Sequence, residues 1–398
     1  MQRLPDNRTR YRYGTYYKDK RKIAMALAWV LRHRPLSLQV IRGLDVCTDE
    51  IGVPNWVLGP LIKRLRRAAY DASGVLRARL NWDVPCLRMT AHAGEDFVHL
   101  LTGLRRVDEA IVDVSLQEGD RIGHGLALGT DPQEWCRRAG SIPVMCEERL
   151  FDLVWEWSWY TQGRRSPGAG RQCVLDRQIA ELSEWIFSRS LTPHDLLRLQ
   201  SYLRNPWALR TVGFPDGTPP KIKRDTYINP KSLDLLTMYL TDPCCFWKSR
   251  EIIRVDPCEE KEEEVLVTLQ KEMRHKVGMR GIAVEVNPTS NLLIGDLGDL
   301  QSHPLWRLRP PRPREDIVPM SVCIGSDDPL IFASNLPQEY QCLSDAMTLA
   351  GLSDEEVRLW IRDTCECGLD RRFTLFPKNN DPITAWYNLF AFSKPLPI

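Results

Sequence analysis

The sequence predicts an α/β fold, namely a (β/α)8 barrel of the TIM type that carries a large, mostly helical insertion. Two observations predict it. Five short apolar stretches, each typical of a buried strand, end in polar side chains, as barrel strands do because their loops converge on one mouth. Most steps between these strand ends are close to, or modestly longer than, the roughly 30 residues of one strand-plus-helix unit. One step is much longer and predicts the insertion.

The composition sets the class of protein. The chain has 398 residues, 43% of them hydrophobic, so it can bury a large core in one large domain or in a few smaller ones. Its 54 basic and 52 acidic residues nearly balance, which argues against a membrane or nucleic-acid partner selected by bulk charge, so no direct nucleic-acid binding is predicted. No apolar run approaches the roughly 20 residues that span a bilayer. The polar start lacks the apolar core of a signal peptide, so a cytoplasmic protein is expected.

The cysteine pattern favours reduced thiols. The 12 cysteines are scattered and lie mostly inside apolar segments, as packing cysteines do. Neither Cys244-Cys245 nor Cys365-x-Cys367 has the two-residue spacing of a zinc knuckle. No structural metal is therefore expected at these positions.

The first predicted strand ends in carboxylates. Residues 21–32 have a helical pattern, and residues 36–46 have the pattern of a buried strand. That strand runs into residues 44–50, LDVCTDE, so its end carries acidic side chains. Residues 58–70 then predict a helix whose basic face is most simply a solvated surface.

The next unit holds a histidine and a glutamate three residues apart. Residues 84–89 predict a short buried strand and residues 96–104 a helix with an apolar stripe, so His92 and Glu95 lie where a strand ends and a helix begins. At such a turn the two side chains can act as a metal ligand and a proton shuttle. The alternative is a packed histidine beside a glutamate that caps the helix.

A second histidine ends the following strand, over residues 120–125. Glycines on both sides of His124 let backbone or substrate come close. Taken alone, this motif is more typical of a turn with an exposed histidine. The strand predicted over residues 281–286 likewise runs into a polar loop, residues 287–291.

The last predicted strand, residues 318–324, runs into two adjacent aspartates. Asp327 and Asp328 at a strand end favour a bound cation or a hydrogen-bonded base. The alternative is an Asp-Pro turn that caps the next helix.

The long step between His124 and residue 287 exceeds one unit by on the order of 130 residues, which predicts an insertion at about residues 131–260. Its many tryptophans indicate a subunit interface, because tryptophan buries much area per residue. It contains a helix with Thr192 as N-cap, Pro193 at the first position and Asp195 at the third. Seven of the 13 tryptophans lie in the insertion: Trp135, Trp155, Trp157, Trp159, Trp185, Trp207 and Trp247.

The insertion and its end contain two charged stretches, one basic and one acidic. Arg164, Arg165 and Arg171 stand among glycines in residues 163–171 and could contact phosphates, although the composition is more typical of a disordered linker. The acidic run over residues 259–264 is explained by a helix that starts there, because carboxylates are favourable at a helix N-terminus.

Four motifs, in this order, closely resemble those of the adenosine deaminase family: HAGE (residues 92–95), RIGHG (121–125), NPTSN (287–291) and SDDPLIF (326–332). Residues 44–50 look like the fourth-strand motif of that family. The resemblance covers residues 38–130 and 265–375 approximately. It implies that barrel strands 4 to 6 lie in residues 1–130, that residues 131–260 are an assembly surface, and that strands 7 to 8 and the C-terminal helices fill residues 261–398.

The resemblance implies a zinc enzyme that replaces the amino group at C6 of adenine with oxygen. His92 and Asp327 would be ligands of Zn²⁺, and His124 would orient and stabilise the attacking hydroxide. Glu95 would shuttle protons to the ring nitrogen. Zinc makes this chemistry feasible near neutral pH because it lowers the pKa of its water to about 7.

The same resemblance implies an adenine nucleoside or nucleotide as substrate. Asp328 would accept a hydrogen bond from the purine. Thr48 stands where the family has a glycine close to the substrate, so it is expected to narrow or reshape the purine site.

One departure from the family concerns the metal site. The first strand of the family supplies a His-x-His pair, and this sequence contains none. Only about 38 residues precede the strand that carries the fourth-strand motif, where three units take roughly 90. We expect the chain to be the C-terminal part of a longer polypeptide; alternatively, another chain completes it, or it is a catalytically decayed scaffold or assembly subunit. The other histidines are predicted to be surface or packing residues: His33, His99, His194, His275 and His303.

The insertion resembles that of the deaminase subunit of the bacterial RADAR phage-defence system, which forms large shells and works with an ATPase. This resemblance implies a large homo-oligomer, an ATPase partner protein and a role in antiviral defence. It also implies a nucleotide substrate such as ATP, for which the arginine-rich loop would have a use.

Overall fold

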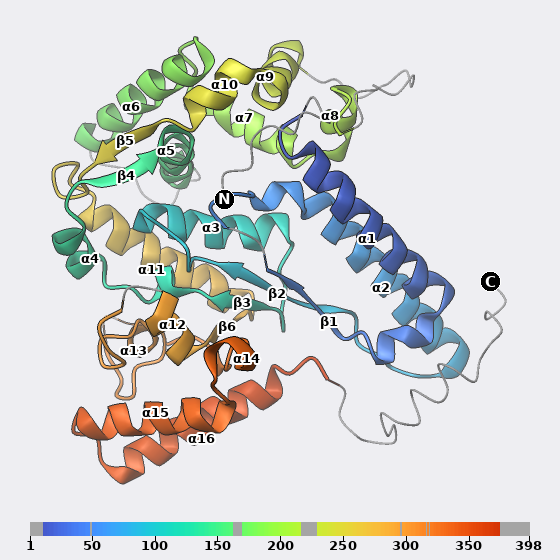
Figure 1. Cartoon of the computed structure of the whole chain (residues 1–398), viewed down its shortest axis with the longest axis vertical. Coiled ribbons are helices and arrows are strands. Elements are labelled where there is room, and N and C mark those ends of the chain that lie inside the picture. Colours follow the sequence, from blue (N-terminus) through green and yellow to red (C-terminus); the bar gives the residue numbers. More distant parts are fainter. Residues whose placement is uncertain are drawn as a thin grey trace.

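A five-stranded parallel sheet lies at the centre of the computed structural model, which describes residues 11–47, 50–161, 169–215, 229–294, 297–315, 317 and 319–374 (Figure 1). The strands follow one another across the sheet in chain order. This confirms the predicted α/β class, and it is consistent with a TIM-like fold; closure into a barrel stays a prediction. The strands are β1 (Gly43–Val46), β2 (Arg88–Ala93), β3 (Arg121–His124), β6 (Ala283–Val286) and β7 (Val322–Ile324).

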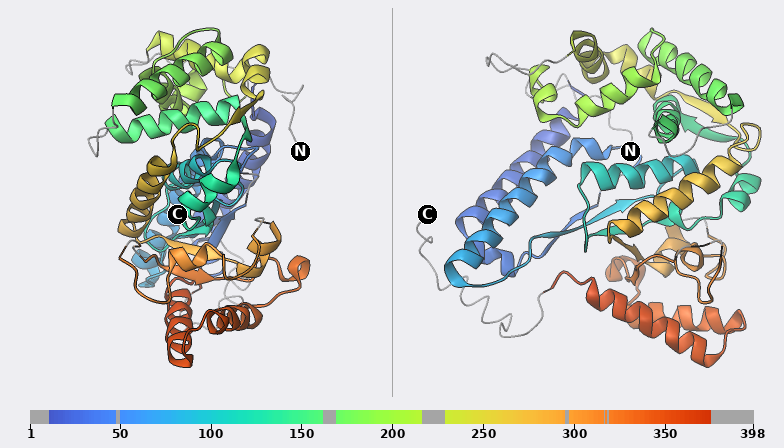
Figure 2. Two further views of the ribbon diagram at one scale, coloured as in Figure 1. Left: turned by 90° about the vertical axis from the view of Figure 1, so that its left-hand side faces the viewer. Right: turned by 180° about the vertical axis from the view of Figure 1, so that it is seen from behind.

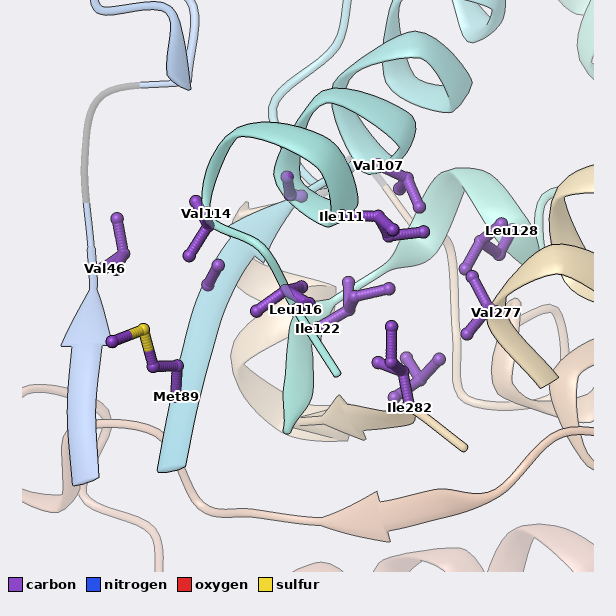
Figure 3. Packing of buried hydrophobic residues seen from close by; sticks show 14 of the residues in the cluster. Val46, Met89, Val107, Ile111, Val114, Leu116, Ile122, Leu128, Val277 and Ile282 are labelled. Atoms are coloured by element: carbon purple, nitrogen blue, oxygen red, sulfur yellow. The ribbon is translucent and has the colours of Figure 1, made fainter. Parts of the chain in front are cut away.

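One face of the sheet is buried under helices. Helices α2 (Gly59–Leu80), α3 (Leu100–Asp113) and α11 (Glu263–Met279) share a single apolar core with the strands (Figure 3). Along β2 the burial alternates, because successive strand residues point to opposite faces: Met89, Ala91 and Ala93 are fully buried. Helix α1 (Gly14–His33) packs along α2 (Figure 1).

The opposite face of the sheet is polar. Arg121 of β3 forms an ion pair with Glu285 of β6 at 2.7 Å, and its guanidinium lies over the ring of Phe373. Arg42 donates from Nε to the carbonyl oxygen of Phe373 at 3.2 Å. The segment that follows α16 (Asp354–Asp370) therefore lies against the start of β1 and β3.

Two predicted strands are misplaced, and in each the reason is a proline. Of residues 36–46, only the last four form β1, while Pro35–Gln39 is a 3₁₀ helix. Residues 84–89 were predicted to be a strand, but β2 begins at Arg88. Pro35 is the first residue of that 3₁₀ helix, where its fixed φ fits, and Pro85 lacks the N–H that a ladder needs, so β2 starts beyond it.

Helix boundaries also differ from prediction. The helix expected over residues 96–104 begins at Leu100, because the Nδ1 atom of His99 accepts the hydrogen bond of Leu101 N at 3.1 Å and caps it. Helix α1 starts seven residues earlier than expected at Gly14, and α2 continues ten residues further to Leu80. The loop expected over residues 287–291 is instead the start of α12 (Pro288–Ile294). The strand predicted over residues 318–324 is shorter in the structure, where β7 has only three residues.

Residues between β3 and α11 form a second, largely helical layer with a core of its own (Figure 2). An antiparallel pair, β4 (Ile142–Met145) and β5 (Ile252–Val255), brackets its helices and was not predicted. The capping box of Thr192 and Asp195 is confirmed, and α7 ends at Leu203. The helices are α5 (Cys146–Thr161), α6 (Ala169–Phe187), α7 (Pro193–Leu203), α8 (Pro206–Thr211), α9 (Pro230–Thr241) and α10 (Pro243–Ser249). Helix α4 (Pro132–Ala139) precedes β4 and packs on the core of the sheet through Cys136.

This layer is tied to the sheet through α5. Trp155 and Trp159 belong to the core of the sheet, whereas Trp185, Trp207 and Trp247 are about half exposed. Arg105 of α3 donates to Asp152 of α5 at 2.7 Å, and both side chains are buried. The tryptophans therefore serve two purposes, since some fill the core and others face solvent.

Arg171, one of the arginines considered for phosphate binding, is already engaged. It lies in α6 and pairs with Glu156 at 2.5 Å and with Glu262 at 3.0 Å. The interpretation as a phosphate contact is therefore wrong for this residue. Arg164 and Arg165 lie outside the described residues.

The remaining helices follow β6 and β7. Helix α13 (Leu305–Leu308) and helix α14 (Pro329–Phe332) are short, while α15 (Leu336–Leu349) and α16 form a helical pair at the end of the molecule opposite α6 and α10 (Figures 1 and 2). Among the described helices, none combines the length and the apolar character that crossing a membrane requires.

Candidate active site

The candidate site begins with two histidines on neighbouring strands. His92 lies inside β2, one residue before its end, rather than beyond the strand as predicted. The parallel register pairs His92 with Gly123 and Ala93 with His124. The two imidazole rings are consequently close, with centroids 4.6 Å apart and planes at 76°.

Gly123 leaves the space that His92 occupies. A Cβ atom at Gly123 would come within 2.8 Å of His92 Cδ2, a distance that real Cβ atoms essentially never show. Since Gly123 is the register partner of His92, the RIGHG motif has a structural reason that the sequence did not reveal. Its glycine makes room for a side chain rather than for a substrate.

Glu95 reaches His124 across the turn that follows β2. The carboxylate oxygen Oε1 lies 2.9 Å from His124 Nδ1, and both side chains are largely shielded from solvent. Asn291 of α12 donates from Nδ2 to the same oxygen at 2.9 Å. His124 has a φ of 64°, in the left-handed region. Residues other than glycine seldom adopt this backbone conformation.

The charge environment favours the protonated form of His124. Burial by itself lowers the pKa of this imidazole, but the hydrogen bond and negative charge of Glu95 outweigh that effect, with smaller contributions from Asp327 and Glu50. The net result is a raised pKa. His124 is thus held as a hydrogen-bond donor toward Glu95.

Two groups of donor atoms in the described residues could hold a metal ion. His92, Glu95 and His124 offer donor atoms that all lie within 4.8 Å of one another, and so do Asp45, Cys47 and His92. His92 is common to both groups. Its Nε2 atom lies 3.7 Å from Asp45 Oδ1, and burial raises the pKa of Asp45 although the histidine opposes this.

Asp327 stands next to this cluster without joining either group. Its Oδ2 atom accepts a hydrogen bond from Ser290 Oγ at 2.5 Å, and its φ is 57°. Its negative charge acts on His124 and on Asp45. The structure therefore places Asp327 near the rim, but brings Glu95 and His124, rather than Asp327, to the donor atom of His92.

Asp328 caps a short helix. Its Oδ1 atom accepts hydrogen bonds from Leu330 N at 3.0 Å and Ile331 N at 3.4 Å, and the residue is exposed. This is the Asp-Pro turn that the sequence offered as the alternative. Thr48, the other predicted substrate contact, lies outside the described residues.

Sequence reasoning missed two residues of the site. Asn291 was placed in a polar loop and in the NPTSN motif but given no role, although its Nδ2 atom lies 2.9 Å from His124 Nδ1 and also contacts Glu95. Glu50 accepts hydrogen bonds from Gly94 N at 2.8 Å and Glu95 N at 3.4 Å. The sequence contained a signal for Glu50, because Glu50 is the last residue of the acidic stretch 44–50 that follows the first predicted strand. No role was predicted for it.

Glu50 is unusual among the carboxylates of the site. Burial raises its pKa to about 7, even though the two backbone N–H groups favour the charged form. Because Glu50 accepts from the backbone of the turn that carries Glu95, it supports that turn and thereby helps to fix Glu95 in place.

Part of the chain is similar to known deaminases. An adenine deaminase of Agrobacterium fabrum is 37% identical over 87 residues, which are 22% of this chain and 24% of the relative. An adenine deaminase of Rhizobium leguminosarum bv. trifolii is 37% identical over 86 residues, with the same coverage. An aminodeoxyfutalosine deaminase of Acidothermus cellulolyticus is 33% identical over 93 residues, which are 21% of this chain and 24% of the relative.

These matches are local. They span about a quarter of the length of each relative, and no protein-family model matches the chain. Together with the parallel sheet and the His92, Glu95 and His124 cluster, the partial matches support a relationship to the adenosine-deaminase-like amidohydrolases.

Proposed function

We propose that this chain contributes to the hydrolytic deamination of an adenine nucleoside or nucleotide, with zinc as cofactor. The observation that carries the proposal is the convergence of His92, Glu95 and His124 at one end of a parallel sheet, in a chain that partly matches deaminases. Carboxyl ends of barrel strands are where the catalytic groups of such enzymes collect.

The donor set fits a divalent metal. Imidazole nitrogen and carboxylate oxygen are ligands that zinc accepts, and His92 takes part in both donor groups. His92 would be the principal ligand. The proposal keeps Asp327 as the second ligand, although in the structure Asp327 stands beside the donor cluster and accepts a hydrogen bond from Ser290 Oγ. A bound zinc ion would supply an activated water near neutral pH, because it lowers the pKa of that water to about 7.

The chain's own residues account for the proton transfers. Water adds at C6 of the purine, and Glu95 accepts the proton that the water releases and delivers it to the ring nitrogen. The proton of the new C6 hydroxyl group then passes to the amino group, the C6–N bond breaks, and ammonia leaves with the 6-oxo product remaining. His124 and Asn291 both contact Glu95 Oε1 at 2.9 Å, so they hold that carboxylate in one orientation throughout.

The proposal also covers the substrate, the partner and the assembly of the whole protein. The match covers 24% of the length of the Agrobacterium fabrum relative, so the activity of the whole protein is part of the proposal. We extend the proposal to ATP as well as adenosine, to an antiviral role with an ATPase partner, and to a large homo-oligomer. The half-exposed Trp185, Trp207 and Trp247 support such an assembly, because aromatic side chains are enriched at interfaces.

A second candidate function is a catalytically decayed scaffold on a deaminase fold. It is favoured by one observation, the lack of a His-x-His pair in the sequence. Metal analysis of the protein as it occurs in the cell separates the two functions. Zinc at one equivalent per chain supports the enzyme, and its absence supports the scaffold.

The direct test is conversion of adenosine and ATP, followed by loss of adenine absorbance. Glu95→Gln should lower kcat by 100-fold or more, since general acid-base catalysis contributes about 10²–10⁴. Glu118→Gln serves as the matched control and should leave the rate unchanged, because Glu118 is exposed and precedes β3, whereas His124 is the last residue of that strand. A zinc-loaded protein that converts neither compound would overturn the proposal.

A further inference from the structure

A cavity of about 340 Å³ lies at the seam between the sheet and the second layer. Three segments line it: residues 50–53 after β1, residues 96–106 around the start of α3, and the β4–β5 pair with the adjoining ends of α5 and α10. None of His92, Glu95, His124 or Asp327 lines it, so the cavity is separate from the candidate active site. Its volume is in the range of pockets that hold a small organic molecule.

Most of the wall is apolar. Several of the apolar side chains are left partly open to solvent, with Ile51 at 43%, Val98 at 44% and Ile252 at 57% exposure. Exposed aliphatic side chains that converge from three segments on one cavity are suited to a flat ring system. The apolar residues that line the cavity are Ile51, Val53, Val98, Pro143, Val144, Met145 and Ile252.

One cation in the wall, Arg250, forms no ion pair among the described residues, although its charge acts on the nearby Glu147 carboxylate. Arg106 pairs with Glu148 at 2.6 Å and with Glu109 at 3.2 Å. Arg250 lies with its guanidinium 4.9 Å from the centroid of the Phe246 ring, and its Nη1 atom contacts only the sulfur of Met145, at 4.0 Å, among the described residues. Its Nε atom is buried with no hydrogen-bond partner in that part of the chain.

Arg250 is therefore prepared to bind an anion. A guanidinium stacked on an aromatic face keeps its in-plane N–H donors available, and these match a carboxylate, sulfonate or phosphate group. The stacking also fixes the side chain, so that little further ordering is needed when the anion binds. At another part of the wall, Glu50 and Asp96 offer oxygen atoms that can accept a hydrogen bond from a ligand.

We propose that this cavity is a binding site for a small aromatic molecule with one anionic group, which pairs with Arg250 while its ring packs on the aliphatic wall. The site is made jointly by the sheet and by the second layer. It shares Glu50, which supports the turn that carries Glu95, with the candidate active site. It shares none of His92, Glu95, His124 or Asp327, so it does not depend on the proposed deaminase chemistry.

The test uses 8-anilinonaphthalene-1-sulfonate, whose ring system, sulfonate and N–H group match the wall, in a fluorescence titration of the whole protein. Saturable binding of one molecule per chain is expected. Arg250→Gln should weaken the affinity by about tenfold or more, since hydrogen bonds to charged groups are worth roughly that factor. Arg254→Gln is the matched control, because Arg254 is an exposed arginine on the same strand pair and does not line the cavity.

A second variant protects the test against misfolding. Ile252→Glu replaces an exposed side chain at the cavity with an anion, so it should fold normally and repel the dye. Loss of binding in both Arg250→Gln and Ile252→Glu, with Arg254→Gln unaffected, supports the site. Equal affinity in Ile252→Glu and the unmodified protein would overturn the proposal whatever Arg250→Gln does.

Discussion

At the scale of single residues, the candidate site depends on glycines that leave space as well as on polar side chains. Gly123 has no side chain where His92 needs space, and Gly325 has none where the Oδ1 atom of Asn287 lies 2.3 Å from the position of a Cβ. His124 and Asp327 both have positive φ. Such backbone conformations persist when the surrounding contacts hold them, here Glu95 for His124 and Ser290 for Asp327.

The prediction at this scale concerns Gly123. Gly123→Ala should displace the imidazole of His92, and kcat/KM should fall by roughly 10-fold to 100-fold, because small misplacements of a catalytic group have effects of that size. Steady-state kinetics and zinc content check it together. Gly278→Ala is the control, since a Cβ there meets nothing within 4 Å and alanine favours the helix α11. Equal activity in the two variants would show that His92 does not need its present position.

At the scale of elements, the contact between α3 and α5 joins the sheet to the second layer. Arg105 lies between Asp152, at 2.7 Å, and Glu109, at 2.6 Å, and all three side chains are shielded from solvent. Burying charges is costly unless they are paired, so the value of this contact is seen when one partner is removed.

Asp152→Ala should lower the free energy of unfolding by about 3 kcal/mol or more, because it leaves a buried guanidinium short of a partner. Urea unfolding monitored by tryptophan fluorescence measures it. Asp234→Ala removes the carboxylate of an exposed pair with Arg189, whose side chains are 61% and 48% exposed, and should cost less than about 1 kcal/mol. Similar losses in both variants would mean that α5 is not anchored through this pair.

At the scale of the whole molecule, the second layer is not a separable attachment. Trp155 and Trp159 of α5 belong to the core of the sheet, so deleting the layer would expose that core. Substitution of the half-exposed Trp185, Trp207 and Trp247 is therefore the better way to examine assembly. The partly open cavity at the seam shows the same dependence, because neither layer forms it alone.

The stability of the whole fold should depend on pH through His303. Burial lowers the pKa of this imidazole to about 4 from 6.5, so below pH 6.5 the unfolded chain binds a proton that the folded chain does not. Stability should therefore fall by about 2 kcal/mol between pH 7.5 and pH 5 through this group.

His303→Asn should flatten that pH dependence. Asparagine keeps an acceptor for Leu305 N, which His303 Nδ1 now binds at 2.9 Å, and it does not titrate. Urea unfolding at the two pH values measures the change. His275→Asn replaces an exposed histidine of α11 and should retain the full slope. An unchanged slope in His303→Asn would assign the pH dependence to other groups.

The sequence alone determined the α/β class, the approximate places of the five strands along the chain, and the capping box of α7, because local periodicity and cap chemistry are short-range properties. It also singled out His92, Glu95 and His124. It could not show that Asn291 contacts Glu95, or that Gly123 makes room for His92, because both depend on strand register and on contacts between distant segments.

Only the tertiary structure shows which partners the polar groups have. Asp328 caps a helix, Asp327 stands beside the donor cluster rather than in it, and Arg171 is neutralised by Glu156 and Glu262. Each of these side chains had two interpretations in the sequence. The choice between them depends on which groups lie within hydrogen-bonding distance in space, and spacing along the chain does not contain that information.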